Sequence, residues 1–295
     1  MNTQHPATLP TRVAEDWDGH LWRLAATTGR RARSRPCTHP DCLWLVTIHH
    51  DHDTGTWTLH METVNDLDQD LVTFWRVLRD RPDELIRACA LTPHARAEQQ
   101  AAYDLDTPDD LERARRVWVL LSQGRGSTLR RTGWRFYRDP GGSSYSFPDY
   151  LAAYVERMPP AAARILGVSL ECRPALEVIA DYGQHPNVLL YVDPPYERAA
   201  RNSLNYRHEM GGESAHRELA DALIACRAAV VLSGYPSNLY DDLYDGWDRI
   251  EMRAWTGNGI RGDRTKTDGD RTEVLWSNRP LVQPDEQLDL LEARP

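Results

Sequence analysis

The 295-residue sequence lacks any apolar run long enough to span a bilayer, so we expect no membrane-spanning helix. Its first seventeen residues have no apolar segment and carry acids early, so we expect no secretory signal. Cysteine is scarce, and the five residues are too irregularly spaced for a disulfide framework. These features favour a cytoplasmic protein with reduced thiols, and an ordinary apolar content of 41% favours a globular core.

Lysine is almost absent, since Lys266 is the only lysine among 35 basic residues. The formal net charge of −9 argues against a generally basic, nucleic-acid-coating protein. Acidic residues are missing from segment 113–138, which holds eight arginines and leaves the remainder of the chain at −17. This asymmetry predicts one local docking surface for a polyanion.

Apolar residues recur at helical spacing after Asp70, and four of them, Leu71, Phe74, Trp75 and Leu78, share one face. Further helices are expected from Pro82 and over 95–103, 109–123 and 148–158, where Pro159-Pro160 should end the last one. A short strand is possible at 43–48. The later chain alternates strands at 168–171, 188–192, 229–233, 249–255 and 272–278 with helices at 174–182, 214–226 and 237–244. This alternation predicts an α/β fold with a mostly parallel sheet and helices on both faces.

The sharpest local motif is Asp193-Pro194-Pro195-Tyr196, which follows the apolar run VLLYV. Open α/β sheets bind ligands at the carboxyl ends of their strands, where this motif falls. Neither proline has an N–H, so the Asp193 carboxylate and the following carbonyl form an acceptor pair suited to an amino group. Tyr196 adds a ring that can stack on a planar base. The alternative is a plain strand-to-loop turn, because Asp-Pro and Pro-Pro are common in turns.

Several separated segments together resemble one family. These are YVDPPY (191–196), VNDLDQDLVTFWRVLR (64–79), NYRHEM (205–210), VVLSGYPSNLYDDLYDGWDR (230–249) and RTEVLWSN (271–278). Over 61–279 the chain resembles the α-class DNA adenine methylases of the Dam and phage type. The resemblance implies methyl transfer from S-adenosylmethionine to the amino group of adenine in duplex DNA. A target base would leave the helical stack to reach such a pocket.

The resemblance also implies a Rossmann-like methyltransferase sheet with a helical DNA-recognition insertion. We expect an atypical N-terminal segment (1–60), a core (61–91 and 166–280), the insertion (92–165) and a loose tail (281–295). In the motif, Asp193, Pro194, Pro195 and Tyr196 would hold the adenine. Asp66 would bind the cofactor ribose, as an acid at a strand tip does elsewhere. The alternative for Asp66 is the N-cap of the next helix, a role that Asp68 can also take.

The sequence departs from the family before Met61. A glycine-rich cofactor region with a GGK element is expected there, but no lysine precedes Lys266, and Gly19, Gly29 and Gly55 stand alone. Either residues 1–60 are an unrelated replacement, which we favour, or they rebuild the cofactor wall differently. In the first case the sheet would lose its first strand and gain an uncovered edge. The chain would then be a DNA-binding remnant; amino-cytosine methylation is a further alternative.

Within the arginine-rich segment, Arg125, Arg130 and Arg131 fall in a Gly- and Ser-rich stretch and are the predicted DNA contacts. Arg113, Arg115 and Arg116 lie on an expected helix and fit a solvated face equally well. In the family, this part of the chain carries target recognition.

No metal is expected, because the reaction needs none. A zinc site from Cys37, Cys42, His49, His50 and His52 is a weak alternative, since the cysteine spacing is loose. We expect a monomer that binds DNA and does not bind a membrane.

Overall fold

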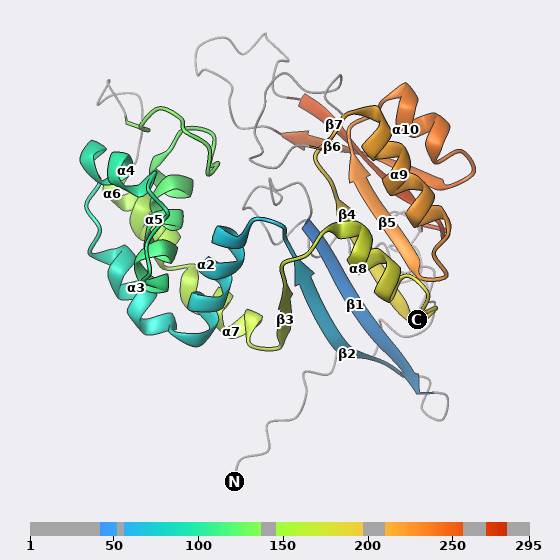
Figure 1. Cartoon of the computed structure of the whole chain (residues 1–295), viewed down its shortest axis with the longest axis horizontal. Coiled ribbons are helices and arrows are strands. Elements are labelled where there is room, and N and C mark those ends of the chain that lie inside the picture. Colours follow the sequence, from blue (N-terminus) through green and yellow to red (C-terminus); the bar gives the residue numbers. More distant parts are fainter. Residues whose placement is uncertain (1–41, 52–55, 137–145, 197–209, 256–269, 282–295) are drawn as a thin grey trace, which may run out of the picture.

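The computed structural model describes residues 42–51, 56–136, 146–196, 210–255 and 270–281 (Figure 1). Its strands are β1 (Cys42–Asp51), β2 (Thr56–Asn65), β3 (Val168–Glu171), β4 (Val188–Asp193), β5 (Ala229–Gly234), β6 (Asp248–Trp255) and β7 (Asp270–Ser277). Its helices are α2 (Gln69–Asp80), α3 (Pro82–Ala90), α4 (Arg96–Ala102), α5 (Asp110–Gln123), α6 (Phe147–Val155), α7 (Met158–Ile165), α8 (Ala175–Tyr182), α9 (Glu213–Ile224) and α10 (Asn238–Leu243). The expected α/β composition is therefore present.

The described strands form one seven-stranded sheet in the order β3-β2-β1-β4-β5-β7-β6. The pairs β2–β3 and β4–β5 are parallel. The pairs β1–β2, β1–β4, β5–β7 and β6–β7 are antiparallel. All strands but β1 and β7 therefore run in one direction, yet the sheet is mixed rather than mostly parallel in its pairing.

Strand β1 overturns the expectation that the sheet lacks a strand here and has an uncovered edge. It lies between β2 and β4 and pairs with both, which makes it an interior strand (Figure 1). A hairpin with β2 determines its direction, because two strands joined by a connection as short as 52–55 must run antiparallel. The expected strand 43–48 is thus the first part of a longer strand that fills the sheet in the reverse direction.

One face of the sheet packs against α8, α9 and α10. Alternate residues of β4 and β5, such as Leu190 and Leu232, join Ile179 of α8 and Leu223 of α9 in a single apolar cluster. The intervening residues Leu189, Val231 and Leu275 are also buried, but neither apolar cluster of the described residues includes them. Helices on the second face therefore stay a prediction.

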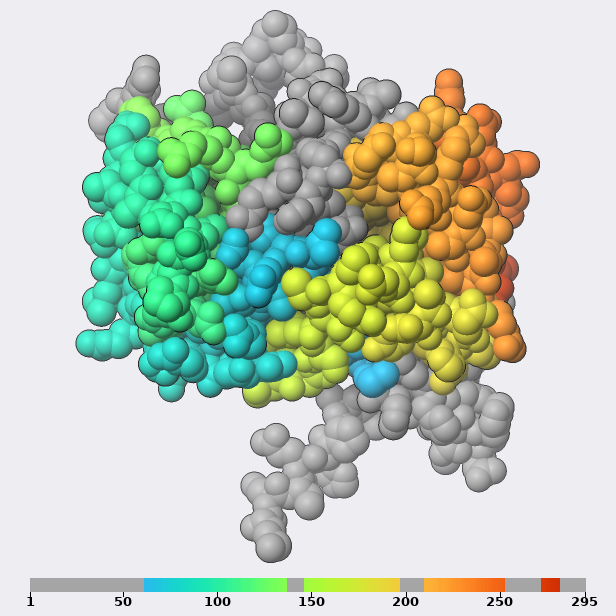
Figure 2. Space-filling model, in the orientation of Figure 1, coloured from blue at the N-terminus to red at the C-terminus, as the bar shows by residue number. Residues whose placement is uncertain are grey.

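A second apolar cluster joins the helices α2 to α7 and contains no strand residue among its buried members. Its centre is α5, where Ala114, Val117 and Val119 are fully buried. In Figure 2 the helices α3–α5 form one side of the molecule and α8–α10 the other. The cluster includes residues of α2 and α3. The helical half of the molecule, α2 to α7, therefore extends beyond the expected insertion at 92–165.

Capping residues determine where these helices begin. Asp109 caps α5, and Ser146 forms a reciprocal capping box with Asp149 at the start of α6. Pro159-Pro160 does not end the helical region as expected. The two prolines fall in the first turn of α7, where the missing N–H groups would have no helical partner.

Candidate functional site

Two acidic side chains flank β1 at the same edge of the sheet. Asp193 is the last residue of β4, and Asp66 follows the last residue of β2. Cys42, the first residue of β1, pairs with Asp193, and Leu43 pairs with Asn65. Both acids therefore lie level at the carboxyl ends of their strands. One strand, β1, separates β2 from β4, so the two strand ends are about 10 Å apart. The order of the strands changes direction between β1 and β4, and open α/β sheets bind ligands beside such a point.

The Asp193 carboxylate is buried and held by a hydroxyl. Its side chain is 6% exposed, and the Ser233 Oγ donates to its Oδ1 at 2.8 Å. Burial raises the pKa of Asp193 to about 7, and the Glu273 carboxylate adds to this, while hydrogen bonds from Ser233 and Tyr196 oppose it. The group thus changes charge near neutral pH, which is common for a functional carboxylate and rare for a solvated one.

The rest of the motif is also buried. Pro194, Pro195 and Tyr196 follow Asp193 without an exposed side chain among them. The Tyr196 ring packs edge to face against Tyr235, with ring centroids 4.4 Å apart. The motif is therefore buried along its whole length.

Asp68, and not Asp66, takes the capping role that the sequence left open between them. Asp68 caps α2 by accepting from the N–H groups of Asp70 and Leu71. Asp66 is buried, and its Oδ1 accepts from the Asp68 N–H at 2.8 Å. Because Asp68 is the cap, the alternative of Asp66 as N-cap is excluded.

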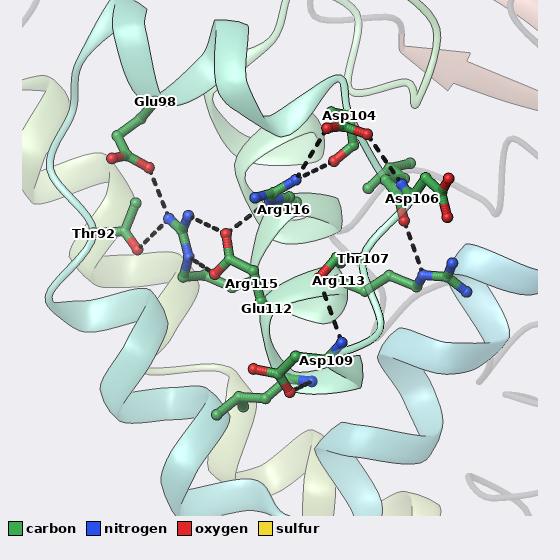
Figure 3. A network of polar contacts seen from close by, with 12 residues as sticks. Thr92, Glu98, Asp104, Asp106, Thr107, Asp109, Glu112, Arg113, Arg115 and Arg116 are labelled. Atoms are coloured by element: carbon green, nitrogen blue, oxygen red, sulfur yellow. Dashed lines mark hydrogen bonds and ion pairs between the residues drawn. The ribbon is translucent and has the colours of Figure 1, made fainter.

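Three helical arginines are engaged within the protein (Figure 3). Arg115 binds Glu112 and Glu98, and Arg116 binds the same Glu112. These contacts lower the pKa of Glu112 to about 2, with the hydrogen bond from Arg115 as the largest cause. Arg113 donates to the Leu105 carbonyl at 3.0 Å. These three side chains brace the helical half.

The predicted DNA-contacting arginines lie in one loop after α5. The loop closes where Arg125 N–H donates to the Gly133 carbonyl and Arg135 N–H donates to the Gln123 carbonyl. Gly124 is required at its start, because a Cβ there would lie 2.5 Å from the Leu120 carbonyl oxygen. Arg125 and Arg131 are exposed, and Arg130 is partly exposed.

Aromatic side chains fix this loop to the helices around it. The Tyr103 hydroxyl donates to the Thr132 carbonyl at 2.6 Å, and the Arg131 guanidinium lies 4.7 Å from the centre of the Tyr103 ring. His94 stacks between Trp134 and Phe147, with centroids 4.4 and 3.9 Å away. These contacts hold the loop in place against the helices, whereas the sequence indicated only a Gly- and Ser-rich coil.

Replacing Arg130 and Arg131 together by alanine is expected to weaken DNA binding and its salt dependence. Each phosphate contact contributes about 0.9 to the slope of log affinity against log salt, so the slope should fall by about two. Fluorescence anisotropy with unmethylated DNA fragments at several salt concentrations measures it. The matched control is Arg76→Ala/Arg79→Ala, which removes the same charge from ion pairs on α2. An equal slope change in both variants would contradict the assignment.

Sequence reasoning missed the residues that support the motif. Ser233 and Tyr235 belong to the segment VVLSGYPSN, and Glu273 to RTEVLWSN, and both segments carried the resemblance without a role. Their position at the carboxyl end of a strand was the available signal for Ser233 and Tyr235. The electrostatic effect of Glu273 on Asp193 follows only from the antiparallel pairing of β7 with β5.

The structure contains no helix long and apolar enough to cross a membrane among the described residues. Within the same residues, no group of three potential metal ligands comes together. Cys37 and His52 of the weak zinc alternative lie outside the described part, as do the side chains of Cys42, His49 and His50.

The buried acid–proline–proline–tyrosine segment lies at the carboxyl end of a strand, where α/β proteins commonly bind their ligands. A family model for D12 class N6 adenine-specific DNA methyltransferases matches residues 58–256. The chain therefore belongs to the D12 class N6 adenine-specific DNA methyltransferases, whose base is adenine rather than cytosine. No curated protein matches the sequence significantly.

Proposed function

We propose that this chain methylates the exocyclic amino group of adenine in duplex DNA, with Asp193 as the acceptor that holds the amino group. The observation that carries this assignment is the buried Asp193 carboxylate, oriented by Ser233 at the end of β4, inside the family match. A flipped adenine would present its amino hydrogens to the carboxylate and to the Pro194 carbonyl. Tyr196 would lie against the base, as its ring now lies against Tyr235.

The acceptors at Asp193 address the main chemical difficulty. The amino nitrogen of adenine is a poor nucleophile, because its lone pair is delocalised into the ring. Two acceptors on its hydrogens favour a pyramidal nitrogen, and a carboxylate stabilises the positive charge that develops there. Only the ionised carboxylate stabilises this charge, and the pKa of Asp193 is about 7. We therefore expect the rate of methyl transfer to rise between pH 6 and 8.

The described residues fit part of S-adenosylmethionine. When bound, this cofactor supplies an electrophilic methyl group on a sulfonium. Asp66 would hold it through the ribose hydroxyls, since it is a buried carboxylate directly after the carboxyl end of β2. On the other side of this edge, β1 starts at Cys42 and runs away from it. In the described residues, no turn from β1 into a helix therefore faces Asp193.

We further propose the Rossmann-like arrangement that the family implies, with residues 92–165 as the DNA-recognition insertion. The strand order, which changes direction between β1 and β4, supports the core. The arginine-containing loop after α5, which backbone hydrogen bonds close, supports the insertion. The boundaries 1–60, 61–91, 166–280 and 281–295 stay predictions; residues 1–41 and 282–295 lie outside the described part. A monomeric, cytoplasmic protein fits the free thiols of Cys89, Cys172 and Cys226.

Transfer of a tritiated methyl group to unmethylated DNA tests the proposed function. Label recovered as N6-methyladenine, and lost in Asp193→Ala, is the expected result. DNA of mixed sequence makes the assay independent of the recognised site. Label in cytosine, or label that persists in Asp193→Ala, would overturn the assignment of Asp193.

Replacing Asp66 by alanine is expected to weaken cofactor binding by about tenfold or more, because two hydrogen bonds from the ribose to a charged acceptor are lost. Isothermal titration calorimetry with S-adenosylmethionine measures the dissociation constant directly. The matched control is Asp68→Ala, which removes the neighbouring carboxylate and its helix cap and should lower the melting temperature instead. Unchanged binding in Asp66→Ala would exclude the ribose role.

The reversed direction of β1 favours one second candidate, a DNA-binding protein with an incomplete cofactor site. Such a protein would bind DNA through the arginine loop and leave it unmodified. Calorimetry of the unaltered chain separates the two candidates. Binding of S-adenosylmethionine supports the enzyme, while intact DNA binding without cofactor binding supports the second candidate.

A further inference from the structure

Two side chains near the carboxyl end of β5 contact the Asp193 motif: Ser233 lies within the strand, and Tyr235 follows its last residue, Gly234. A Cβ on Gly234 would lie 3.0 Å from the Tyr240 ring and 3.2 Å from the Trp276 ring. The glycine therefore lets β5 approach the core closely, while its neighbours reach β4.

Ser233 is the buried partner of the Asp193 carboxylate. It is 4% exposed, and its Oγ lies 2.8 Å from Asp193 Oδ1 and 3.3 Å from the Val192 carbonyl oxygen. A hydroxyl has one proton, so the shorter contact to the carboxylate is the main one. The parallel pairing of Val192 with Leu232 brings Ser233 level with Asp193. This contact orients the Asp193 carboxylate toward β5.

Tyr235 has the corresponding position for Tyr196. The two rings pack edge to face at an interplanar angle of 69°. This arrangement is a favoured one for aromatic pairs and limits rotation of the Tyr196 ring. Ser233 in β5 and Tyr235 directly after it thus contact both side chains of the motif that would touch the base.

We propose that Ser233 is a positioning residue for methyl transfer, which orients the Asp193 carboxylate, and that Tyr235 positions the Tyr196 ring. This inference rests on the proposed function. Among the described residues, the groups that act on the Asp193 carboxylate are Ser233 from β5, Glu273 from β7 and Tyr196 directly after β4. Among them, Ser233 and Tyr196 favour the charged carboxylate, and Glu273 and burial oppose it.

Ser233→Ala removes a donor to the charged form and should move the Asp193 titration upward by about one pH unit. The turnover rate at pH 7 should fall about fivefold, in line with the lower ionised fraction, and recover largely at pH 9, while the KM for DNA stays unchanged. Ser233→Thr keeps the hydroxyl and should restore the wild-type pH profile. Ser277→Ala is the matched control, because it removes another buried hydroxyl of the same sheet.

The experiment combines the pH profile of tritiated methyl transfer with a carbon NMR titration of aspartate carboxyls. The Asp193 resonance is assigned as the one missing in Asp193→Asn. A shifted titration and a shifted pH profile in Ser233→Ala alone support the proposal. Unshifted curves, or equal shifts in Ser277→Ala, would overturn it. If Ser233→Thr also shifts, size rather than hydrogen bonding is responsible, which overturns it as well.

The two readouts separate this inference from the proposed function. A wild-type chain that transfers no methyl group contradicts the proposed function, while the NMR titration still measures the effect of Ser233 on Asp193. For Tyr235, the phenylalanine variant keeps the ring and should retain the wild-type rate. Tyr235→Ala should lower the turnover rate without changing DNA affinity. Equal rates in both variants would remove Tyr235 from the proposal.

Discussion

Asp193→Asn is expected to abolish methyl transfer and, at the same time, to stabilise the folded protein above pH 7. The amide keeps the shape of the side chain, so Ser233 can still donate to its oxygen. It loses the negative charge and offers an N–H in place of one acceptor. Loss of one such electrostatic contact lowers turnover by about 100- to 1000-fold. Tritiated methyl transfer at pH 8 measures the loss, with salt-dependent DNA binding as the check on folding.

The stability gain follows from the pKa of Asp193. Its folded value of about 7 lies above the ordinary 3.8, so between pH 4 and 7 the folded state binds more protons than the unfolded state. Stability is therefore full below pH 4 and falls as the pH rises through 7, by roughly 4 kcal/mol at most. Asparagine carries no charge at any pH and removes this loss.

Melting temperatures of the wild type and Asp193→Asn at pH 5 and pH 8 test the sign. The gap between the two proteins should widen as the pH rises. Asp242→Asn is the matched control, because it removes an exposed carboxylate on α10. The difference in melting temperature between this variant and the wild type should be the same at both pH values. A pH-independent gap would mean that Asp193 is not the group that titrates. Gain of stability with loss of activity is the usual signature of a functional site that is held under strain.

Val46→Pro is expected to unfold the protein or to lower its melting temperature by roughly 10 °C or more. Val46 lies in the middle of β1 and pairs with Glu62 on one side and Leu189 on the other. Proline removes an N–H from an interior strand, where no solvent replaces the lost bond. If residues 1–60 were an appendage outside the core, the same change would have little effect.

Circular dichroism melting curves of purified protein measure this effect. The matched control is Glu213→Pro at the first position of α9, where a proline is compatible with the helix. The control should melt close to the wild type. Equal melting temperatures of the two variants would contradict the interior position of β1. Such a result would favour the alternative that the N-terminal segment is an unrelated replacement outside the sheet.

The acid–proline–proline–tyrosine turn could be placed from sequence alone, because a short apolar run ending in Asp193 has few structural options. The helix from Gln69 to Asp80 was likewise predictable from the spacing of Leu71 and Phe74 and from a nearby acid. Local signals decide such features within a few residues. The same holds for α5 with its Asp109 cap.

The prediction that Pro159-Pro160 ends the preceding helix was wrong. A proline pair ends one helix and equally begins another, and only packing chooses between the two. Here Met158 and Ala162 of α7 join the apolar cluster of the helical half, so the segment after the prolines is helical. The arginines of α5 were also left open, because exposure and ion pairing have the same local sequence pattern.

The sequence by itself determined the family, the Asp193 turn and the elements around it, since these depend on residues close together in the chain. Tertiary structure alone decided that β1 runs backwards through the middle of the sheet, because a hairpin with β2 fixed its direction. It also decided that Ser233 holds Asp193, although 40 residues separate them. Contacts between distant segments depend on strand order and register, which no local pattern encodes.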